Sequence, residues 1–270
     1  MKILSGTELA GFIKERQAKQ VRALRQADKI IPKLVIIKTT DNPVIGTYVK
    51  MKRRYGDDIL VEVEVREPSN SDLFETIKNA NDDVSVHGII IQLPLASIDQ
   101  TEEAVNLVDP LKDVDGLGVR ATLTPATPMA IDWLLAGYSV DLGGKHIVVV
   151  GNGRLVGAPL AKLWRDAGNH VVVCDSATAD IATEVSKADI IVSATGSPGL
   201  ITQGMVRNGA VVVDAATSAE NGAIVGDVAD DVYARDDITL TPRKGGVGPL
   251  TVCALFDNVI RAARDSIAVT

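Results

Sequence analysis

Two polar side chains stand four residues apart in a segment that we predict to be helical, Tyr48 and Lys52 within residues 44–55. Because side chains four positions apart lie one above the other on a helix face, the phenol and the ammonium would lie together. Such a pair can polarise a substrate and transfer a proton. Taken alone, the pair also fits a solvated helix surface.

Further polar residues follow elements of the same half of the chain. Gln92 comes near the end of the apolar run 86–93, where a polar side chain would face the edge at which parallel sheets bind ligands. Asp113 and Asp115 lie in the sequence Lys-Asp-Val-Asp-Gly, residues 112–116, near a predicted domain crossing. A solvent-facing strand end also explains Gln92, and acidic loop residues are commonly just solvated.

A glycine-rich turn in the second half of the chain indicates a site for a phosphorylated ligand. Gly151, Gly153 and Gly157 follow an apolar run and precede a predicted helix. Glycine there lets the backbone approach a pyrophosphate, which the N–H groups of the helix start can bind. The spacing is one residue longer than the usual dinucleotide fingerprint, but Asp175 closes the next apolar run, where an acidic residue accepts ribose hydroxyls. A turn that needs glycine only for its geometry is the alternative.

Alternating helices and strands would position these residues. In residues 1–110 the apolar runs are short and continuous, as in strands buried on both faces, and the segments between them are amphipathic. This pattern predicts αβ units around a parallel sheet. The predicted helices are residues 5–27, 44–55, 71–79 and 99–107, and the predicted strands are residues 33–38, 58–67 and 86–93.

The pattern lapses into a loop over residues 109–128, which is the predicted domain crossing. A connecting helix is predicted next, with Thr127 as its N-cap and Pro128 in its first turn. The second domain would add a helix over 179–187, strands over 189–195 and 210–214, and a last helix over 250–267 that packs back against the first domain. We therefore predict an α/β fold with an αβ parallel-sheet catalytic domain, residues 1–122 plus 250–270, and a Rossmann-type dinucleotide-binding domain, residues 123–249.

Composition narrows the function classes. The chain has 270 residues and a formal net charge of -7, which suits two small domains and disfavours nucleic acid or membrane as the main partner. Cys174 and Cys253 lie in apolar runs, which predicts buried thiols, no disulfide and a reducing compartment. No stretch approaches the roughly 20 apolar residues of a membrane span, and the start lacks a signal-peptide core. We expect a cytoplasmic protein with a small-molecule partner.

Several segments match one enzyme family in order and spacing. They are Tyr48-Val49 with Lys52, and residues 86–95, 112–116, 127–128, 149–159, 226–228 and 245–251. On these segments the chain resembles the bifunctional methylenetetrahydrofolate dehydrogenase/cyclohydrolase family over nearly its whole length. The resemblance implies NAD(P)-dependent oxidation of 5,10-methylenetetrahydrofolate to the methenyl form, and hydrolysis of that form to 10-formyltetrahydrofolate. It also implies a homodimer, a role in one-carbon metabolism and purine biosynthesis, and a folate site between the domains.

The resemblance assigns roles to individual residues. Lys52 would be the catalytic group of the hydrolytic step, Tyr48 would orient the folate, Gln92 would hold Lys52 in its working state, and Asp115 would bind the pterin ring. A lysine can serve in this way where burial or a neighbour lowers its pKa. The implied substrate site also includes Leu93, Pro94, Gly245, Gly246, Val247 and Pro249. The implied cofactor site consists of Gly151, Asn152, Gly153, Arg154, Val156, Gly157, Asp175, Ser176, Thr195, Gly196 and Thr217.

The chain departs from the family pattern at positions that bear on cofactor and hydrolysis. Asn152 and Gly153 stand where the family usually has Arg and Ser, and Asp175 stands where it usually has His. A carboxylate there would repel the 2′-phosphate of NADP and accept the hydroxyls of NAD, although Arg154 offers a replacement cation. NADP is the family default, and NAD stays open. Ile45 replaces the family's usual serine, which weakens the expectation of hydrolysis more than that of hydride transfer.

Other functions stay open on the sequence alone. One alternative is a dehydrogenase without cyclohydrolase activity, and another is a non-catalytic dinucleotide-binding regulator. A dehydrogenase for a hydroxy or amino acid would need a His or Lys motif that does not stand out. We interpret His87, His146 and His170 as isolated structural residues, and no metal-ligand spacing joins them.

Overall fold

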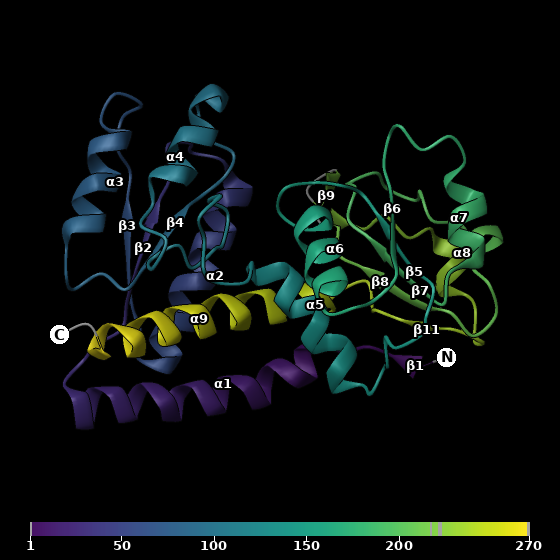
Figure 1. Cartoon of the computed structure of the whole chain (residues 1–270), viewed down its shortest axis with the longest axis horizontal. Coiled ribbons are helices and arrows are strands. Elements are labelled where there is room, and N and C mark those ends of the chain that lie inside the picture. Colours follow the sequence, from purple (N-terminus) through teal and green to yellow (C-terminus); the bar gives the residue numbers. More distant parts are fainter. Residues whose placement is uncertain (1, 217, 221–222, 269–270) are drawn as a thin grey trace. The chain divides into compact units, whose positions relative to one another are not determined.

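The computed structural model describes residues 2–216, 218–220 and 223–268. The chain divides into two compact units, which are described one at a time below and labelled by element in Figure 1. One unit consists of residues 11–126 with 252–270, and the other of residues 1–10 with 127–251. We call them the lysine unit and the nucleotide unit, after the residues considered below.

The lysine unit contains a parallel sheet of three strands in the order β3-β2-β4. The strands are β2 (Lys33–Ile37), β3 (Glu62–Arg66) and β4 (Gly88–Ile91). Residues 34–37 of the central strand are fully buried, which is why this strand has a continuous apolar run. The edge strand β3 alternates acidic and apolar residues, as predicted, but it starts at Glu62 because the preceding helix continues to the buried Ile59.

Helices cover both faces of this sheet. They are α1 (Gly6–Ala23) with the π-helical turn η1 (Leu24–Asp28), α2 (Pro43–Ile59), α3 (Leu73–Asp82), the short turn η2 (Ile98–Gln100) with α4 (Thr101–Leu107), and α9 (Val247–Asp265) with η4 (Ser266–Ala268). Helices α3 and α4 lie beside the strands in Figure 1 and share one apolar core with Val35, Ile37, Ile89 and Ile91. On α2, Gly56 packs so closely on β3 that a Cβ there would lie 2.5 Å from a methyl of Val63.

Residues 252–265 of the last helix belong to the lysine unit. The ring of Phe256 lies 5.0 Å from the ring of Tyr55, centroid to centroid, and Phe256 is fully buried. The hydroxyl of Tyr55 also donates to the thiol of Cys253 at 3.2 Å. The helix therefore contributes both apolar surface and polar contacts to this unit.

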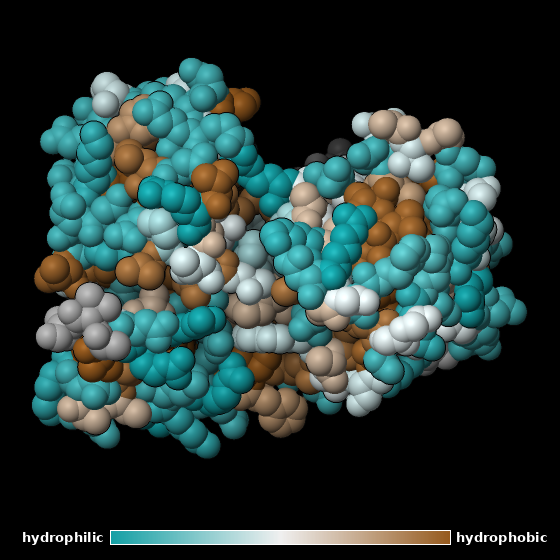
Figure 2. All heavy atoms as spheres, viewed as in Figure 1, coloured by the Kyte–Doolittle hydropathy of each residue, from teal (hydrophilic) through white to brown (hydrophobic). Residues whose placement is uncertain are grey.

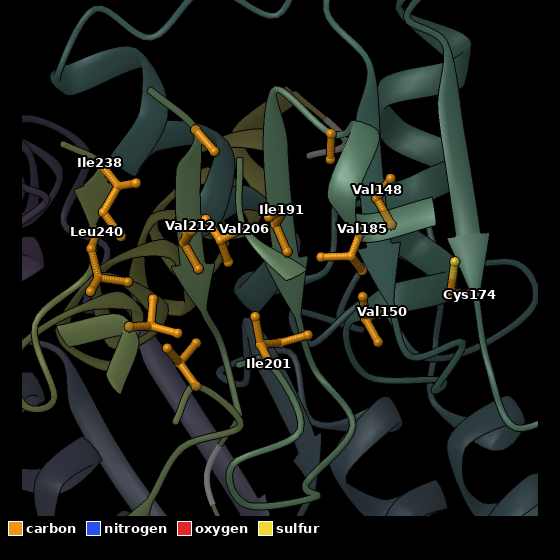
Figure 3. Packing of buried hydrophobic residues seen from close by; sticks show 14 residues of the cluster. Val148, Val150, Cys174, Val185, Ile191, Ile201, Val206, Val212, Ile238 and Leu240 are labelled. Atoms are coloured by element: carbon orange, nitrogen blue, oxygen red, sulfur yellow. The ribbon is translucent and has the colours of Figure 1, made fainter. Parts of the chain in front are cut away.

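The nucleotide unit contains a six-stranded sheet in the order β1-β11-β8-β7-β5-β6, and all its strand pairs are parallel. The strands are β1 (Lys2–Ile3), β5 (Ile147–Val150), β6 (Val171–Cys174), β7 (Ile190–Ser193), β8 (Val211–Asp214) and β11 (Thr239–Leu240), and an antiparallel pair is formed by β9 (Ser218–Glu220) and β10 (Ala223–Val225). The helices are α5 (Ala126–Gly137), α6 (Gly157–Asp166), α7 (Ile181–Lys187), η3 (Gln203–Met205) and α8 (Asp230–Tyr233). Buried Val, Ile and Leu side chains from neighbouring strands form one apolar layer of this unit (Figure 3).

Several element boundaries differ from the prediction. Helix α5 begins at Ala126, so Thr127 lies inside the helix and is not its N-cap. Helix α9 begins at Val247, which places Pro249 in the first turn, where proline's missing N–H costs nothing. The strands β1 and β11 are missing from the prediction because two residues carry no readable period.

The face seen in Figure 2 is mostly hydrophilic. Within the described part of the chain, no helix is long and apolar enough to cross a membrane. Cys174 and Cys253 are both buried free thiols, as predicted.

Candidate active site

Lys52 and Gln92 meet in the lysine unit. The Nζ of Lys52 donates a hydrogen bond of 2.9 Å to Oε1 of Gln92. Gln92 directly follows β4, and its backbone N–H donates to the carbonyl of Ile37 at 2.8 Å, which continues the sheet pairing. Its side-chain Nε2 donates to the carbonyl of Leu93 at 3.2 Å. The glutamine is therefore fixed at both ends and presents its oxygen to the lysine.

Asp115 lies close enough to Lys52 for the two charges to interact. Burial lowers the pKa of Lys52 from its usual value, and the carboxylate of Asp115 acts in the opposite direction. Burial raises the pKa of Asp115, which Lys52 opposes and Asp113 reinforces. A lysine with a lowered pKa exchanges its proton more readily near neutral pH. The predicted catalytic residues Lys52, Gln92 and Asp115 are thus brought together in one unit.

The remaining residues predicted beside Lys52 take different environments. Tyr48 lies one helical turn before Lys52 on α2 and is half-buried. Leu93 is half-buried and Pro94 is exposed, directly after Gln92. Ile45, which replaces the family's serine, is only 4% exposed and belongs to the core. It therefore fills apolar space where the serine would offer a hydroxyl.

A pocket of about 370 Å³ lies in the nucleotide unit. It is lined by Gly153, Arg154, Leu155, Val156, Ala194, Thr195, Gly196, Ala215 and Ala216. The predicted glycine turn and the predicted residues Thr195 and Gly196 therefore share one pocket, although they lie some forty residues apart in the sequence. The pocket is also lined by residues that the sequence analysis did not predict: Leu155, Ala194, Ala215 and Ala216. Thr217 lies outside the described residues.

The glycines of the turn are required by its geometry. Gly151 has a φ of +107°, a conformation that L side chains rarely adopt. A Cβ on Gly157 would lie 1.9 Å from the carbonyl oxygen of Gly151, so only glycine allows α6 to start against the end of β5. Helix α6 then begins at Gly157 with its first N–H groups at this turn. This arrangement fits a phosphate, because a helix start supplies both donors and a positive dipole end.

Asp175 lies directly after β6, beside the glycine turn. Its Oδ1 accepts from the N–H of Ala177 at 3.0 Å, and its Oδ2 lies 3.5 Å from Nδ2 of Asn152. Ser176 follows and is exposed. Neither Asp175 nor Ser176 is among the residues that line the pocket. Asp175 is instead connected to the pocket's turn through Asn152.

Two carboxylates that the sequence prediction missed, the buried Asp227 and the half-buried Asp214, hold loops that line the pocket. The Oδ2 of Asp227 accepts from the hydroxyl of Ser193 at 2.7 Å and from the N–H and hydroxyl of Thr195 at 2.7 and 2.9 Å. Asp227 is fully buried. Its own backbone N–H donates to Asp214 at 3.2 Å. Asp227 therefore ties the loop after β7, which lines the pocket, to the loop that follows β10.

Asp214 holds the neighbouring loop in the same way. It accepts from the N–H groups of Ala216 and Val228 at 3.1 and 3.0 Å. Burial raises its pKa, and these N–H donors oppose the rise. A Cβ on Gly226 would lie 2.0 Å from its Oδ2, so the close approach of Asp214 needs glycine there. The only sequence signal was the Gly-Asp-Val match at 226–228, which carried no assigned role.

The predicted substrate residues Gly245, Gly246, Val247 and Pro249 belong to the nucleotide unit, whereas Lys52 belongs to the lysine unit. The carbonyl of Gly245 accepts from the N–H of Thr7 at 3.0 Å. A Cβ on Gly6 would lie 1.8 Å from the carbonyl oxygen of Gly246. Within their unit, these glycines thus serve a close contact between two backbone segments.

The histidines have structural surroundings, but they are not all isolated as predicted. The Nδ1 of His87 accepts from the N–H of Lys33 at 3.2 Å. The rings of His146 and His170 stack at 5.8 Å between centroids, because the residues precede the paired strands β5 and β6. Among the residues that the structure describes, no group of three His, Cys, Asp or Glu side chains is arranged to hold a metal ion.

Comparison with known proteins gives consistent matches along the chain. The family model for the tetrahydrofolate dehydrogenase/cyclohydrolase catalytic domain matches residues 4–115, and the model for the NAD(P)-binding domain of the same family matches residues 125–267. The chain is 37% identical over 277 residues to the bifunctional protein FolD of a Nitratiruptor species, and the match covers 98% of both chains.

Solved structures agree with these matches. The chain resembles the bifunctional methylenetetrahydrofolate dehydrogenase/cyclohydrolase FolD of Campylobacter jejuni with a TM-score of 0.93 and 32% identity, over 98% of this chain and 99% of that one. It resembles the Trypanosoma brucei enzyme, solved with NADP cofactor and inhibitor, with a TM-score of 0.91 and 31% identity, over 98% of both chains.

Proposed function

Because the chain belongs to the tetrahydrofolate dehydrogenase/cyclohydrolase family, we propose that it catalyses both of the family's reactions. It oxidises 5,10-methylenetetrahydrofolate to 5,10-methenyltetrahydrofolate with a nicotinamide dinucleotide, and it hydrolyses the methenyl form to 10-formyltetrahydrofolate. The observation that carries this proposal is the hydrogen bond of 2.9 Å from Lys52 to Gln92, formed beside Asp115 where burial lowers the pKa of the lysine.

Lys52 transfers the proton in the hydrolytic step. Water adds to the cationic methenyl carbon and loses one proton, which leaves a neutral carbinol. One carbon–nitrogen bond then breaks as the formyl C=O forms, so one proton reaches the departing nitrogen and the hydroxyl proton is released to solvent. A neutral lysine accepts the first proton, and the resulting ammonium donates the second. Gln92 orients Nζ through its Oε1, Tyr48 orients the folate, and Asp115 binds the polar edge of the pterin.

Hydride transfer requires no acid–base chemistry from the side chains. The lone pair of the adjacent folate nitrogen drives loss of hydride from the methylene carbon, so no protein acid or base takes part. A bound nicotinamide dinucleotide supplies the hydride acceptor. Gly151, Gly153 and Gly157 would hold its pyrophosphate at the start of α6, and Thr195 and Gly196 would line the rest of the pocket.

The choice between NAD and NADP depends on Asp175 in this proposal. The carboxylate is fixed directly after β6 by the N–H of Ala177, at the position where an acidic residue accepts ribose hydroxyls. The chain therefore uses NADP, the family default, and uses NAD nearly as well. Arg154, which lines the pocket, is the cation nearest in sequence to the turn and accounts for the use of NADP.

A dehydrogenase that has lost the hydrolytic step is the second candidate, because the buried Ile45 replaces a hydroxyl near the lysine. One experiment separates the candidates: oxidation of methylenetetrahydrofolate by the purified chain with NAD and NADP in parallel, with the absorbance of the methenyl product followed over time. Turnover without accumulation of the methenyl form supports both activities. Accumulation indicates the dehydrogenase alone, and absence of turnover with either cofactor contradicts the proposal and favours a dinucleotide-binding regulator.

The functional division of the chain is also part of the proposal. We assign folate binding and catalysis to residues 1–122 with 250–270 and dinucleotide binding to residues 123–249. Residues 1–10 are an exception to this division in the structure, because they belong to the nucleotide unit. The protein acts as a cytoplasmic homodimer on small molecules, without nucleic acid or membrane as a partner. Light scattering behind a sizing column measures the oligomeric state, and a monomer at micromolar concentration would contradict this part.

A further inference from the structure

We propose that Asn258 and Asp113 are positioning residues for Asp115, which they act on by fixing the backbone on either side of it. This inference rests on the proposed function, because that function gives Asp115 its role beside Lys52. All the residues involved belong to the lysine unit.

Asn258 fixes the backbone before Asp115. It lies on α9, is only 4% exposed, and uses its side-chain Nδ2 for two hydrogen bonds. One goes to the carbonyl of Val114 and the other to the carbonyl of Thr124, each at 2.9 Å. Since an amide nitrogen has two hydrogens, both are used to hold the two ends of the segment 114–124.

Asp113 fixes the backbone after Asp115. Its Oδ1 accepts from the N–H of Gly116 at 2.9 Å, and its Oδ2 accepts from the N–H of Gly118 at 2.8 Å. The side chain is only 4% exposed, so these donors satisfy a carboxylate that water does not reach well. The turn they close contains Gly116 at a φ of +67°, where a Cβ would lie 2.8 Å from the carbonyl oxygen of Leu123.

The rest of the segment leaves the backbone little freedom. The side chain of Val114 is fully buried, and a Cβ on Gly88 of β4 would lie 2.8 Å from one of its methyls. Lys112 donates to the carbonyls of Asn81 and Asp83 at 2.6 and 2.8 Å, at the end of α3. Each residue around Asp115 in the sequence 112–116 therefore has a contact that fixes its position.

These contacts fix the position of the Asp115 carboxylate relative to the Lys52 side chain. Asp115 has no rigid secondary structure of its own, yet its charge acts directly on Lys52. A shift of one ångström in a catalytic group costs about 100-fold in rate. Asn258 and Asp113 supply the rigidity that a helix or strand supplies for Lys52 and Gln92.

The test compares Asn258→Ala, Asp113→Asn, Asp115→Asn and the double variant Asn258→Ala/Asp115→Asn in the full chain. We expect each single variant to lower kcat for hydrolysis of methenyltetrahydrofolate by about 10- to 100-fold. The double variant should be no slower than Asp115→Asn alone, because Asn258 acts through Asp115. Asn106→Ala is the matched control: Asn106 accepts from the N–H of Val119 at 2.8 Å in the same loop, but beyond the turn. Its rate should stay within about twofold.

An NMR titration of the Lys52 side chain in the free protein gives a readout that needs no substrate. Asp115→Asn should lower the pKa of Lys52, because it removes the carboxylate that raises this pKa. Asn258→Ala and Asp113→Asn should lower the pKa of Lys52 as well, because they let that carboxylate move away from the lysine. Additive rate losses in the double variant, or an unchanged Lys52 titration in both positioning variants, would overturn the inference. If the unmodified chain does not turn over folates, the proposed function fails, and the titration alone decides the inference. Thermal unfolding identifies a variant that fails to fold, in which case the other positioning variant carries the test.

Discussion

The Lys52 site and the dinucleotide pocket both contain carboxylates that are buried or half-buried, but these carboxylates face different partners. Asp115 faces an ammonium, so its charge acts on the protonation of Lys52. Asp214 and Asp227 accept hydrogen bonds from N–H and O–H groups of two loops, and these bonds hold the loop backbone in place. The same kind of group therefore acts on a neighbouring charge in one unit and holds the backbone of a pocket in the other. The variants below test that difference.

The largest effect is expected at the proton-transferring group itself. Lys52→Met should lower the rate of methenyltetrahydrofolate hydrolysis by about 10²–10⁴-fold, the usual contribution of a general acid–base group. Hydride transfer should persist, because the folate nitrogen supplies its driving force. Separate assays of the two reactions check this. Equal loss of both would show that Lys52 only binds the folate.

The next effect is expected in the pocket. Asp227→Ala removes the acceptor for Ser193 and for both donors of Thr195, which should lower the free energy of unfolding by about 1–3 kcal/mol. The KM for the dinucleotide should rise by about tenfold or more, since the loop after β7 lines the pocket. Hydrolysis of supplied methenyltetrahydrofolate should be unaffected once the variant is folded.

Asp166→Ala is the control for this variant, because Asp166 is an exposed carboxylate that pairs with Lys162 at 2.6 Å on α6. Surface pairs of this kind contribute about 0–1 kcal/mol. Denaturant unfolding and steady-state kinetics measure both variants. A loss of hydrolysis by Asp227→Ala equal to its loss of dinucleotide binding would remove the distinction between the two carboxylate sites.

A smaller effect is expected at the edge of the pocket. Asp175→Ser removes the carboxylate but keeps a polar side chain, so the preference for NADP over NAD should rise by about tenfold, or about 1.4 kcal/mol. The ratio of kcat/KM for the two cofactors measures it. An unchanged ratio would mean that the carboxylate does not reach the ribose.

The smallest effect is expected in the pH dependence of hydrolysis. Lys52 accepts a proton only when it is neutral, so the rate should fall as the pH drops below its lowered pKa. Because the carboxylate of Asp115 raises the pKa of Lys52, Asp115→Asn should move this fall to lower pH. A pH–rate profile of both proteins checks the direction. A fall that moves to higher pH would contradict the assignment of charges.

The sequence predicts best where a long segment repeats a pattern. The continuous apolar run predicted the buried strand β2, and the four-residue spacing placed Tyr48 and Lys52 on one face of α2. The position of Gln92 at the end of an apolar run predicted its place at the end of a strand. Helix boundaries are less certain, as Thr127 demonstrates, because one residue's capping preference competes with the packing of the whole helix.

The missed residues act over long distances in the sequence. Asn258 lies 144 positions from Val114, whose carbonyl it binds, and Asp227 lies 32 positions from Thr195. Both carbonyls that Asn258 binds, and one of the donors to Asp227, are backbone groups. Because every residue carries these groups, no residue type marks that end of the contact. Such contacts become readable only when the fold has brought the segments together.

The edge of the six-stranded sheet has a consequence for the order of folding. The strand β1 pairs in parallel with β11, Lys2 opposite Thr239, and the N–H of the fully buried Leu4 donates to the carbonyl of Leu240 at 2.9 Å. The backbone N–H of Leu4, which the ribosome makes early, therefore cannot form this hydrogen bond until residue 240 has been made. During synthesis, the β1 segment stays unpaired while the strands of the lysine unit are already available to pair.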